Sequence, residues 1–405
     1  MNKVISTEKI PIKLWLDDIE DGALTQAKNL ANLPFAFKHI AIMPDSHQGY
    51  GMPIGGVLAT KKVIIPNAVG VDIGCGMCAV RTSLKSITQE EIKIIFGGSK
   101  EYKGGIRSAI PVGFNHHSKK QDESLMPKID VITGYNTKNE YPIIHQEYNS
   151  ALKQLGTLGS GNHFIEIQKG SDGYIWIMIH SGSRNLGYKV ARHYNEIAKK
   201  LNEKWFTSIP KSSDLAFLVL DSQEGHDYLK EMNYCVEFAL ANRKLMMNRI
   251  VRIIQEEYNF HTIQDTITWN INIAHNYATI ENHFGVNVMI HRKGATSARE
   301  GQIGIIPGSQ GTKSYIVKGK GNSESFNSCS HGAGRTMSRT KARATLNLEE
   351  EIKKMDDKGI LHSIRGKNNL DEASSAYKNI DTVMKNQKDL VDTIVELTPL
   401  GVIKG

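Results

Sequence analysis

The stretch that most constrains this chain is NAVGVDIGCGMCAVRTSL, residues 67–84, where a carboxylate and two thiols interrupt a glycine turn. Asp72, Cys75 and Cys78 stand among glycines, which let a backbone pass close to a bound group. The residues that follow, 80–84, alternate apolar and polar side chains and predict a strand. The fold must therefore accommodate potential metal ligands in a tight turn that leads directly into a strand.

This turn superficially matches a dinucleotide-binding fingerprint, with Gly74, Gly76 and Ala79 at the expected positions. That fingerprint works only where a helix begins at the turn and offers its N–H groups to a pyrophosphate. Because residues 80–84 predict a strand, we exclude the dinucleotide site. A phosphate-binding loop of the P-loop type fails at 308–314, GSQGTKS, because the spacing is wrong, although these glycines could still hold phosphate.

The Cys75–Cys78 pair has the CxxC spacing of zinc ribbons and thioredoxin-like proteins. A zinc ribbon needs a second pair, and Cys235 and Cys329 each stand alone. A thioredoxin-type site needs the motif to open a helix. Four cysteines in 405 residues do not form a disulfide framework, and they favour a reducing cytoplasm.

Composition describes an ordinary globular protein, with 40% hydrophobic and 23% charged residues. No run of about 18 apolar residues is present, so we expect no membrane span, and the amino terminus lacks the apolar core of a signal peptide. The net charge of +8 suits a polyanionic partner without establishing one.

Patterning along the chain mixes strands with helices and predicts an α+β fold. Motifs occur in every third of the sequence, so we expect one domain over residues 1–405, with a helical excursion at about 186–258. The predicted elements are strands at 80–84 and 174–179, helices at 186–204 and 226–258, short strands within 286–320, a basic helix at 332–345 and a helical tail at 376–399, with an irregular region at 96–148.

Three histidines occupy unusual positions at the ends of predicted strands. His163 follows a glycine turn in GTLGSGNHFIE, His180 ends the apolar run IWIMIH, and His275 ends INIAH. Each one alone is better explained by a core histidine, but together with Asp72 and Cys75 they indicate a metal centre. Imidazole, carboxylate and one thiolate suit Zn, Mn or Fe, and five ligands are enough for two ions with a bridging thiolate.

A second motif, SCSHGAGRTMSRTKAR, places His331 before a glycine run and three arginines. On the predicted helix, Arg335, Arg339 and Arg343 share one face, and a helix start with nearby glycines binds phosphate. A solvated helix face explains the arginines equally well. His331 itself could be a phosphate contact, a core residue or a nucleophile.

Taken together, these motifs resemble the RtcB-type RNA ligases, which join 3′-phosphate and 5′-hydroxyl RNA ends. The resemblance covers nearly the whole chain, because the family's motifs occur in order. They are KHIAIMPDSHQGYGMPIGGV, AVGVDIGCGM, LGTLGSGNHFIEI, HSGSR, AHNY, GIIPGSQGTKSYIVKGKGN, SCSHGAGR and the terminal KG.

The resemblance implies a single large α+β domain of layered sheets flanked by helices, and it assigns roles to matching residues. Two Mn²⁺ ions would be held by Asp72, Cys75, His163, His180 and His275, with Cys75 bridging them. His331 would attack the α-phosphate of GTP and carry GMP, with Asp45 as a carboxylate near the metals. Cys78 lies outside the pattern and is expected in the core. The implied nucleotide pocket comprises Asn162, His163, Phe164, Ile165, Glu166, His275, Asn276, Pro307, Gly308, Ser309, Gln310, Ser314, His331, Gly332, Ala333, Gly334, Tyr377 and Lys404.

The implied activity is GTP-dependent joining of RNA 3′-phosphate or 2′,3′-cyclic phosphate ends to 5′-hydroxyl ends, in tRNA splicing or RNA repair. The partners would be broken tRNA, rRNA or other structured RNA, and an archease-type accessory protein. Two alternatives use the same residues: a dinuclear metal phosphodiesterase acting on RNA, and an RNA-binding module with structural metals. Neither needs a histidine in a glycine-rich loop that carries GMP.

Overall fold

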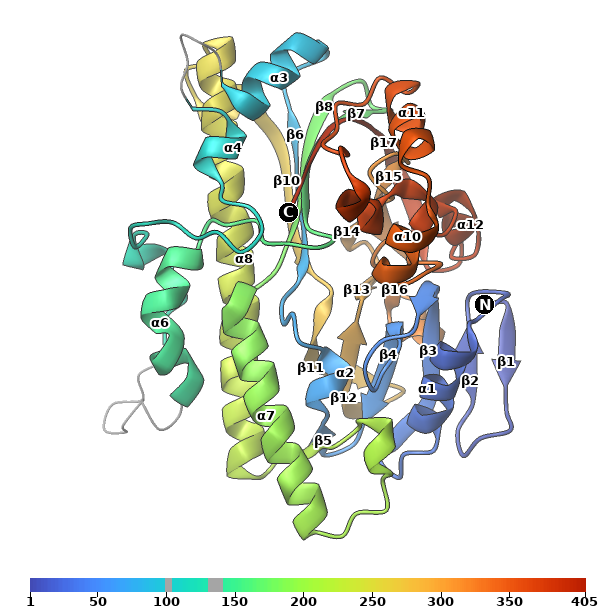
Figure 1. The fold of residues 1–405 in the computed structure, drawn as a ribbon. Helices are drawn as coiled ribbons and strands as arrows, with labels where there is room; N and C mark the ends of the chain where they lie inside the picture. The colour runs from blue at the N-terminus through green and yellow to red at the C-terminus, as the bar shows by residue number, and fades with distance from the viewer. Residues whose placement is uncertain (99–103, 130–140) are drawn as a thin grey trace.

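The computed structural model describes residues 1–98, 104–129 and 141–405, and it has an α+β fold with two large sheets flanked by helices (Figure 1). The expected fold class is confirmed. The Rossmann interpretation is excluded by the structure as well, because residues 76–82 form a strand and no helix follows the glycine turn.

The seven-stranded sheet carries most of the predicted strands and is covered on both faces. Helix α8, Gln223–Tyr258, packs its apolar side chains on one face, and α11, Leu348–Asp356, lies over the other. Burial on both faces makes this sheet a rigid support for the loops at its ends. Its strand order is β10 (Ile267–Ala274), β6 (Gly76–Thr82), β8 (Ile175–Ser181), β7 (Phe164–Gly170), β17 (Val391–Lys404), β15 (Ser314–Gly319) and β14 (Ile303–Ile306).

The six-stranded sheet packs against α1, Asp21–Ala31, and α2, Pro66–Val69, on one face. Its other face packs against α12, Ile380–Lys385, and the two-stranded sheet of β13 (Ala295–Ser297) and β16 (Ser328–Ser330). The order is β1 (Lys3–Ile5), β2 (Ile12–Leu14), β3 (Ala36–His47), β4 (Ile54–Thr60), β12 (Val286–Lys293) and β11 (Asn276–His283).

Two long helices occupy the predicted helical excursion and run alongside each other (Figure 1). Helix α7, Arg184–Lys204, and α8 pack through apolar residues at helical spacing, as the pattern predicts. Ser222 caps α8 by accepting a hydrogen bond from the Gly225 amide, and Asn259 ends it in the left-handed conformation. Between these helices, β9 (Leu218–Val219) pairs with β5 (Val63–Ile64).

The prediction of a helical tail at 376–399 is wrong over most of its length. Only α12 is helical, and β17 forms a strand from Val391 to Lys404 between β7 and β15. The β-branched residues Thr393, Ile394 and Val395 favour a strand, and pairing on both sides satisfies the backbone. A register shift between Pro399 and Gly401 accommodates the proline, which has no N–H to donate.

The basic helix predicted at 332–345 is shorter than expected. Helix α10 spans Arg339–Thr345 and is capped by Ser338, whose hydroxyl accepts from the Lys341 amide. Residues 331–334 are therefore a loop that precedes the helix by several residues, and Arg335 lies outside it. The prediction that a helix begins beside these glycines is wrong, because α10 begins at Arg339.

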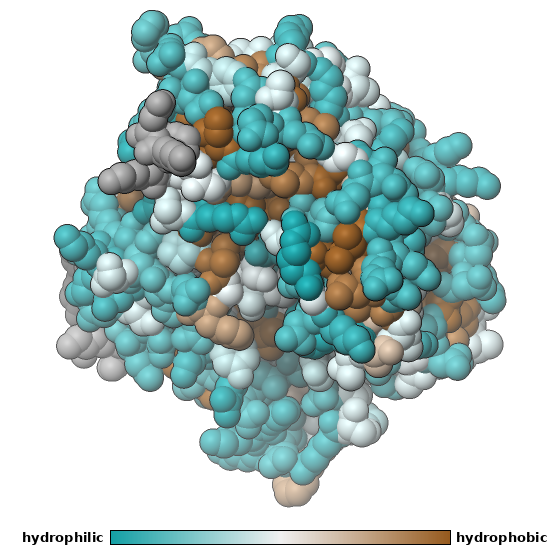
Figure 2. Space-filling view, turned by 45° about the horizontal axis from the view of Figure 1, so that its top comes forward, coloured by the Kyte–Doolittle hydropathy of each residue, from teal (hydrophilic) through white to brown (hydrophobic). Residues whose placement is uncertain are grey.

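The expected irregular region at 96–148 is mostly without strands in its described part, although helices enter it at both ends. Elements here are α3 (Gln89–Gly97), α4 (Ile106–Ala109) and α6 (Pro142–Gln154), and α9 (Ile263–Thr266) lies farther along the chain. Among the described residues, no helix is both long and apolar enough to cross a membrane. The face in Figure 2 is largely hydrophilic, with apolar atoms in recesses between the hydrophilic ones.

Candidate metal centre and nucleotide pocket

Four of the five predicted metal ligands lie at one edge of the seven-stranded sheet. Cys75 and His163 immediately precede β6 and β7, whereas His180 lies at the end of β8 and His275 follows β10. Because β6 and β7 run antiparallel to β8, and β10 runs antiparallel to β6, two strand starts meet two strand ends at this edge. Register confirms the convergence, since His180 pairs with both Met77 and Phe164.

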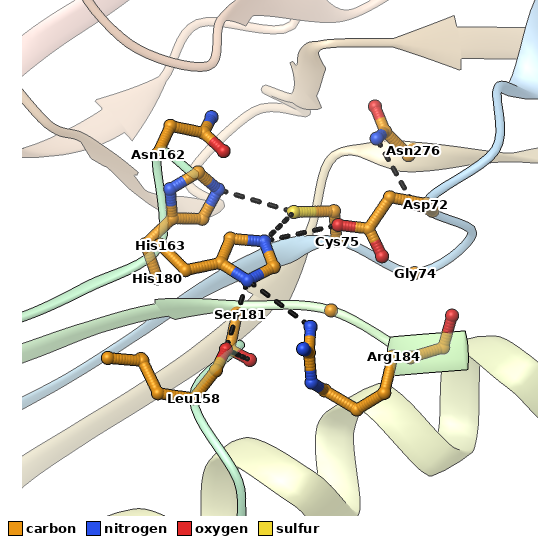
Figure 3. A network of polar contacts seen from close by, with 12 residues as sticks. Asp72, Gly74, Cys75, Leu158, Asn162, His163, His180, Ser181, Arg184 and Asn276 are labelled. Atoms are coloured by element: carbon orange, nitrogen blue, oxygen red, sulfur yellow. Dashed lines mark hydrogen bonds and ion pairs between the residues drawn. The ribbon is translucent and has the colours of Figure 1, made fainter. Parts of the chain in front are cut away.

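The side chains of Cys75, His163 and His180 point toward one another, with the Asp72 carboxylate beside them (Figure 3). Cys75 Sγ lies 3.3 Å from His180 Nε2 and 3.5 Å from His163 Nε2, and the three ligand atoms lie within 4.8 Å of one another. His275 Nε2 is 3.4 Å from His180 Nε2, and Asp72 Oδ2 is 3.1 Å from His163 Nε2. The structure therefore brings all five predicted ligands into one cluster.

Close backbone approach explains part of the glycine content around this cluster. A Cβ at Gly182, two residues beyond His180, would collide with the Asp72 carboxylate. Asn276 Nδ2 donates to the Asp72 backbone oxygen at 3.1 Å and holds the Asp72 loop against β11. The hydrogen bond from Asn276 thus holds the Asp72 backbone in place, and the absence of a side chain at Gly182 leaves room for the carboxylate beside the imidazoles.

The protonation states in the cluster suit metal binding. Burial lowers the pKa of His180 and His275 well below the usual value, so both rings are neutral and can offer a lone pair. Burial alone would raise the pKa of Asp72, but hydrogen bonding and charge from His163, together with Arg184, lower it to about 2. Burial and the Asp72 carboxylate raise the pKa of the Cys75 thiol well above its usual range.

This donor set fits a divalent transition metal. Neutral imidazoles, one carboxylate and one thiol face each other, and the buried Nδ1 of His275 has no protein partner among the described residues. The Nε2 atoms of His180 and His275 lie 3.4 Å apart, close enough for one cation to take a lone pair from each ring.

Metal binding should release a proton from the Cys75 thiol. The metal-free thiol is protonated at pH 7 because its pKa is raised, whereas His180 and His275 are already neutral because their pKa values are lowered. We expect about one proton released per Cys75 on addition of Mn²⁺, and metal affinity that falls as pH falls. Calorimetry in buffers of different ionisation enthalpy measures this number. A release that persists unchanged in Cys75→Ala would contradict the assignment.

Asp45 orients His331 at the side of this cluster. Its Oδ2 accepts from His331 Nδ1 at 2.6 Å, from the His331 amide at 3.0 Å and from the Gly332 amide at 3.2 Å. Burial would raise the pKa of Asp45, but the charge and hydrogen bond of His331 lower it, so Asp45 is a carboxylate. With Nδ1 holding its proton toward Asp45, the Nε2 lone pair of His331 is available for bonding.

The loop around His331 depends on another close approach. Gly334 has a φ of 75°, and a Cβ there would collide with the Asp45 backbone carbonyl. The ring of His331 lies 4.8 Å from that of His275, measured between centroids. The candidate nucleophile is therefore fixed directly beside the metal cluster.

A cavity of about 240 Å³ connects the metal cluster and His331 to the carboxyl terminus. Of the predicted nucleotide-binding residues, those that line it are Asn162, Phe164, His275, Asn276, Pro307, Gly308, Ser309, Gln310, His331, Gly332, Ala333, Gly334, Tyr377 and Lys404. Asp72, Cys75 and His180 line its inner end.

The other four predicted pocket residues, His163, Ile165, Glu166 and Ser314, lie outside the cavity lining. Ile165 points to the opposite side of the sheet, into the core beneath α8. Glu166 is buried and accepts a hydrogen bond from Gln168 Nε2, and burial raises its pKa to about 8. Ser314 Oγ accepts from the Gly308 amide at 3.1 Å and so supports the glycine loop.

The carboxyl terminus is held against the body of the protein by the two apolar residues that precede Lys404. Val402 and Ile403 are fully buried in β17, and Lys404 pairs with Phe164 across the strands. Lys404 Nζ donates to the Asn162 backbone oxygen at 3.2 Å, so the last lysine lies in the cavity wall.

Glu372 is a central residue of the cavity that the sequence did not indicate. Its carboxylate contacts Arg335 at 3.2 Å, Arg339 at 3.1 Å and Lys404 at 3.5 Å, and it also accepts from the Tyr377 hydroxyl. Glu372 ends a short 3₁₀ helix, Lys367–Glu372, in a segment without a recognisable pattern. Arg343 is exposed and does not join this network.

Comparison with known proteins connects this geometry to a family. Residues 26–405 match the family model described as tRNA-splicing ligase RtcB. The chain is 41% identical to the RNA-splicing ligase RtcB of Escherichia coli, covering 100% of this chain and 99% of that protein. It is 31% identical to the tRNA-splicing ligase RtcB of Thermococcus kodakarensis, covering 98% and 95%. It is also 31% identical to the RNA-splicing ligase RtcB homolog 1 of Entamoeba dispar, covering 95% and 82%.

Proposed function

The chain belongs to the RtcB family and is an RNA ligase, and on this premise we propose that it joins RNA ends with GTP through a GMP–His331 intermediate. The acceptor end would carry a 3′-phosphate or a 2′,3′-cyclic phosphate, and the other end a 5′-hydroxyl. The observation that carries the proposal is the Asp45–His331 pair, which frees Nε2 beside a metal-ligand cluster.

The metal cofactor in this proposal is a pair of Mn²⁺ ions held by Asp72, Cys75, His163, His180 and His275. Bound there, they would neutralise phosphate charge and stabilise leaving oxygens during in-line displacement. The protein supplies the preformed ligand set at the sheet edge, which is buried and rigid.

The chemical steps follow from the orientation of His331. Nε2 attacks the α-phosphorus of GTP, an N–P bond forms, and pyrophosphate leaves with the electrons of the broken P–O bond. Nδ1 keeps its proton, which stays hydrogen-bonded to the Asp45 carboxylate, so the ring bonded to phosphorus carries a positive charge beside a negative one. From this positively charged ring the N–P bond breaks to release neutral imidazole, a good leaving group, which makes the bound GMP transferable.

Two further displacements complete the proposed joining reaction. Where a 2′,3′-cyclic phosphate is present, water first attacks its phosphorus, and the P–O2′ bond breaks to leave a 2′-hydroxyl and a 3′-phosphate. An oxygen of the RNA 3′-phosphate then attacks the phosphorus on His331, and the N–P bond breaks to give an RNA end capped with GMP. The 5′-hydroxyl finally attacks the RNA phosphorus, gives up its proton to solvent, and GMP leaves with the P–O electrons.

Guanine recognition is assigned to the outer end of the cavity, at Lys404 and Tyr377. An ammonium offers only donors, so it favours the O6 acceptor of guanine over the amino group of adenine. Tyr377 presents its ring nearby, held by the hydrogen bond to Glu372. Lys404 Nζ lies over the Phe164 ring, 5.5 Å from its centroid, in a cation–π contact.

Lys404→Met should weaken the use of GTP without releasing metal. Losing a charge-assisted hydrogen bond of roughly 1.5–3 kcal/mol lowers affinity by about ten- to a hundred-fold. The apolar methionine keeps much of the side-chain volume, and Gly405 still donates to the His163 backbone oxygen. Titration of guanylylation against GTP measures the apparent affinity. An unchanged value would remove Lys404 from the guanine site.

The proposal extends to the setting of the reaction. Broken tRNA, rRNA or other structured RNA would be the substrates, and an archease-type accessory protein would support turnover. A cytoplasmic location fits the four cysteines, all of which are free and buried.

An RNA-joining assay with omissions tests the proposed function. A 3′-phosphate strand and a 5′-hydroxyl strand should be joined only when both GTP and Mn²⁺ are present. A dinuclear phosphodiesterase would instead cleave RNA with Mn²⁺ alone and show no dependence on GTP. Joining that proceeds without GTP would contradict the proposal.

A further inference from the structure

A second cavity opens from the nucleotide pocket on the side away from Lys404. It has a volume of about 710 Å³, and we call it the side cavity. It shares Asp72, Asn162, Asn276, His47, Arg335 and Arg339 with the nucleotide pocket, so the two spaces meet beside the metal cluster. A group bound in the side cavity can therefore reach the reacting phosphorus from a direction different from that of guanine.

The wall of the side cavity includes an aromatic side chain that is mostly exposed to solvent. Tyr50 is 78% exposed, and it lies between Gly49 and Gly51 in the loop that follows β3. An exposed ring of this kind offers a π-face to a ligand, and stacking on such rings is how proteins hold unpaired nucleobases.

The loop that carries Tyr50 is fixed on several sides. Lys293 Nζ donates to the backbone oxygens of Tyr50 and Asn67, the latter at 2.8 Å. The Gln26 side-chain amide brackets Gly49, donating to its oxygen at 2.6 Å and accepting from its N–H at 3.0 Å. The Met52 amide also donates to the Tyr50 oxygen at 2.8 Å. The ring is thus presented from an ordered backbone, which reduces the entropy lost when a base binds.

The junction between the two cavities carries two guanidinium groups, both of which also contact the Glu372 carboxylate. Arg335 and Arg339 both line it, and the Arg339 side chain is 45% exposed there. Lys293 is buried in the wall. The acidic Glu20 at the rim is engaged by the Gln48 amide. Cations at the inner end and an aromatic ring at the outer end match a nucleotide with its phosphate pointing inward.

We propose that the side cavity binds the terminal nucleotide of the RNA strand that ends in a 3′-phosphate, with its base on Tyr50 and its phosphate at Arg335 and Arg339. This assignment rests on the proposed function of His331. The two guanidinium groups decide between the RNA ends, because a terminal 3′-phosphate carries up to two negative charges and a 5′-hydroxyl carries none. From the junction, an oxygen of that phosphate can bond to the phosphorus on His331 as the N–P bond breaks.

Separate titrations of the two RNA strands test the proposal. Tyr50→Ala should raise the KM for the 3′-phosphate strand by about ten-fold or more, in line with the loss of one base stack. The KM for the 5′-hydroxyl strand and GMP labelling of the enzyme should not change. Tyr50→Phe keeps the ring and should restore the wild-type KM. Phe206→Ala, which removes an aromatic that is 93% exposed at the far end of α7, is the matched control and should have no effect.

A 3′-phosphate strand whose last nucleotide is abasic makes the test specific. It should raise the wild-type KM to the level of Tyr50→Ala, and Tyr50→Ala should then add nothing further. An increase confined to the 5′-hydroxyl strand, or equal KM values for wild type and Tyr50→Ala, would overturn the assignment. Absence of GMP labelling in the wild type would instead count against the proposed function, so the two failures are distinguishable.

Discussion

We expect His331→Ala to abolish both enzyme guanylylation and RNA joining, a loss on the order of 10⁴-fold or more. The reason is that no other described side chain near the cluster is held as His331 is, with Nδ1 on a buried carboxylate and Nε2 free. The measurement is transfer of label from α-labelled GTP to protein, followed by the single-turnover rate of joining.

Measurements of folding and of metal content in His331→Ala serve as its controls. His331 lies in a loop and its side chain is 14% exposed, so its removal should leave the fold and bound Mn²⁺ intact. His226→Ala, which changes an exposed histidine in the first turn of α8, should behave as the wild type. A His331→Ala protein that still acquires GMP would assign the nucleophile elsewhere.

Cys75→Ala should lower Mn²⁺ affinity by at least about 100-fold and remove joining activity with it. The expected loss exceeds that of a supporting residue around a metal, since Cys75 Sγ contacts two imidazoles directly. The Mn²⁺ affinity measured by calorimetry and the joining rate measured at fixed Mn²⁺ should fall together. Raising the Mn²⁺ concentration should recover only part of the joining rate.

Cys78→Ala is the matched control, because it changes an equally buried thiol three residues away. Cys78 points into the core beneath α8, and Cys75 points into the cavity. We expect Cys78→Ala to cost about 1 kcal/mol of unfolding free energy through lost packing, with metal affinity unchanged. Metal loss in Cys78→Ala but not in Cys75→Ala would invert the ligand assignment.

The metal-ligand cluster was predictable because its members share one local signal. His180 and His275 end apolar strands, and Cys75 and His163 begin strands after glycine turns. When neighbouring strands pair antiparallel, the start of one strand lies beside the end of the next, so these residues meet at one edge of the sheet. The sequence pattern therefore predicts that the ligands lie close together, although it does not show the order in which the strands pair. The Asp45 carboxylate came only from the family resemblance, since its link to His331 spans 286 residues.

The parts that sequence reasoning missed depend on long-range packing. The sequence pattern predicts a helix over 376–399, and only the place of β17 between β7 and β15 explains why most of this segment is a strand. Glu372 carries no local signal, because its role comes from cations contributed by Arg335, Arg339 and the chain terminus. The side cavity likewise arises where β3, β11 and the Asp72 loop meet.

The most direct test of the account is the identity of the covalent adduct. The protein should be incubated with GTP and Mn²⁺, denatured, digested and analysed by mass spectrometry under conditions that preserve acid-labile N–P bonds. The account predicts a GMP adduct on the peptide that contains His331, lost in acid and discharged by 3′-phosphate RNA. GMP on a lysine, or joining activity with no adduct on any residue, would contradict it.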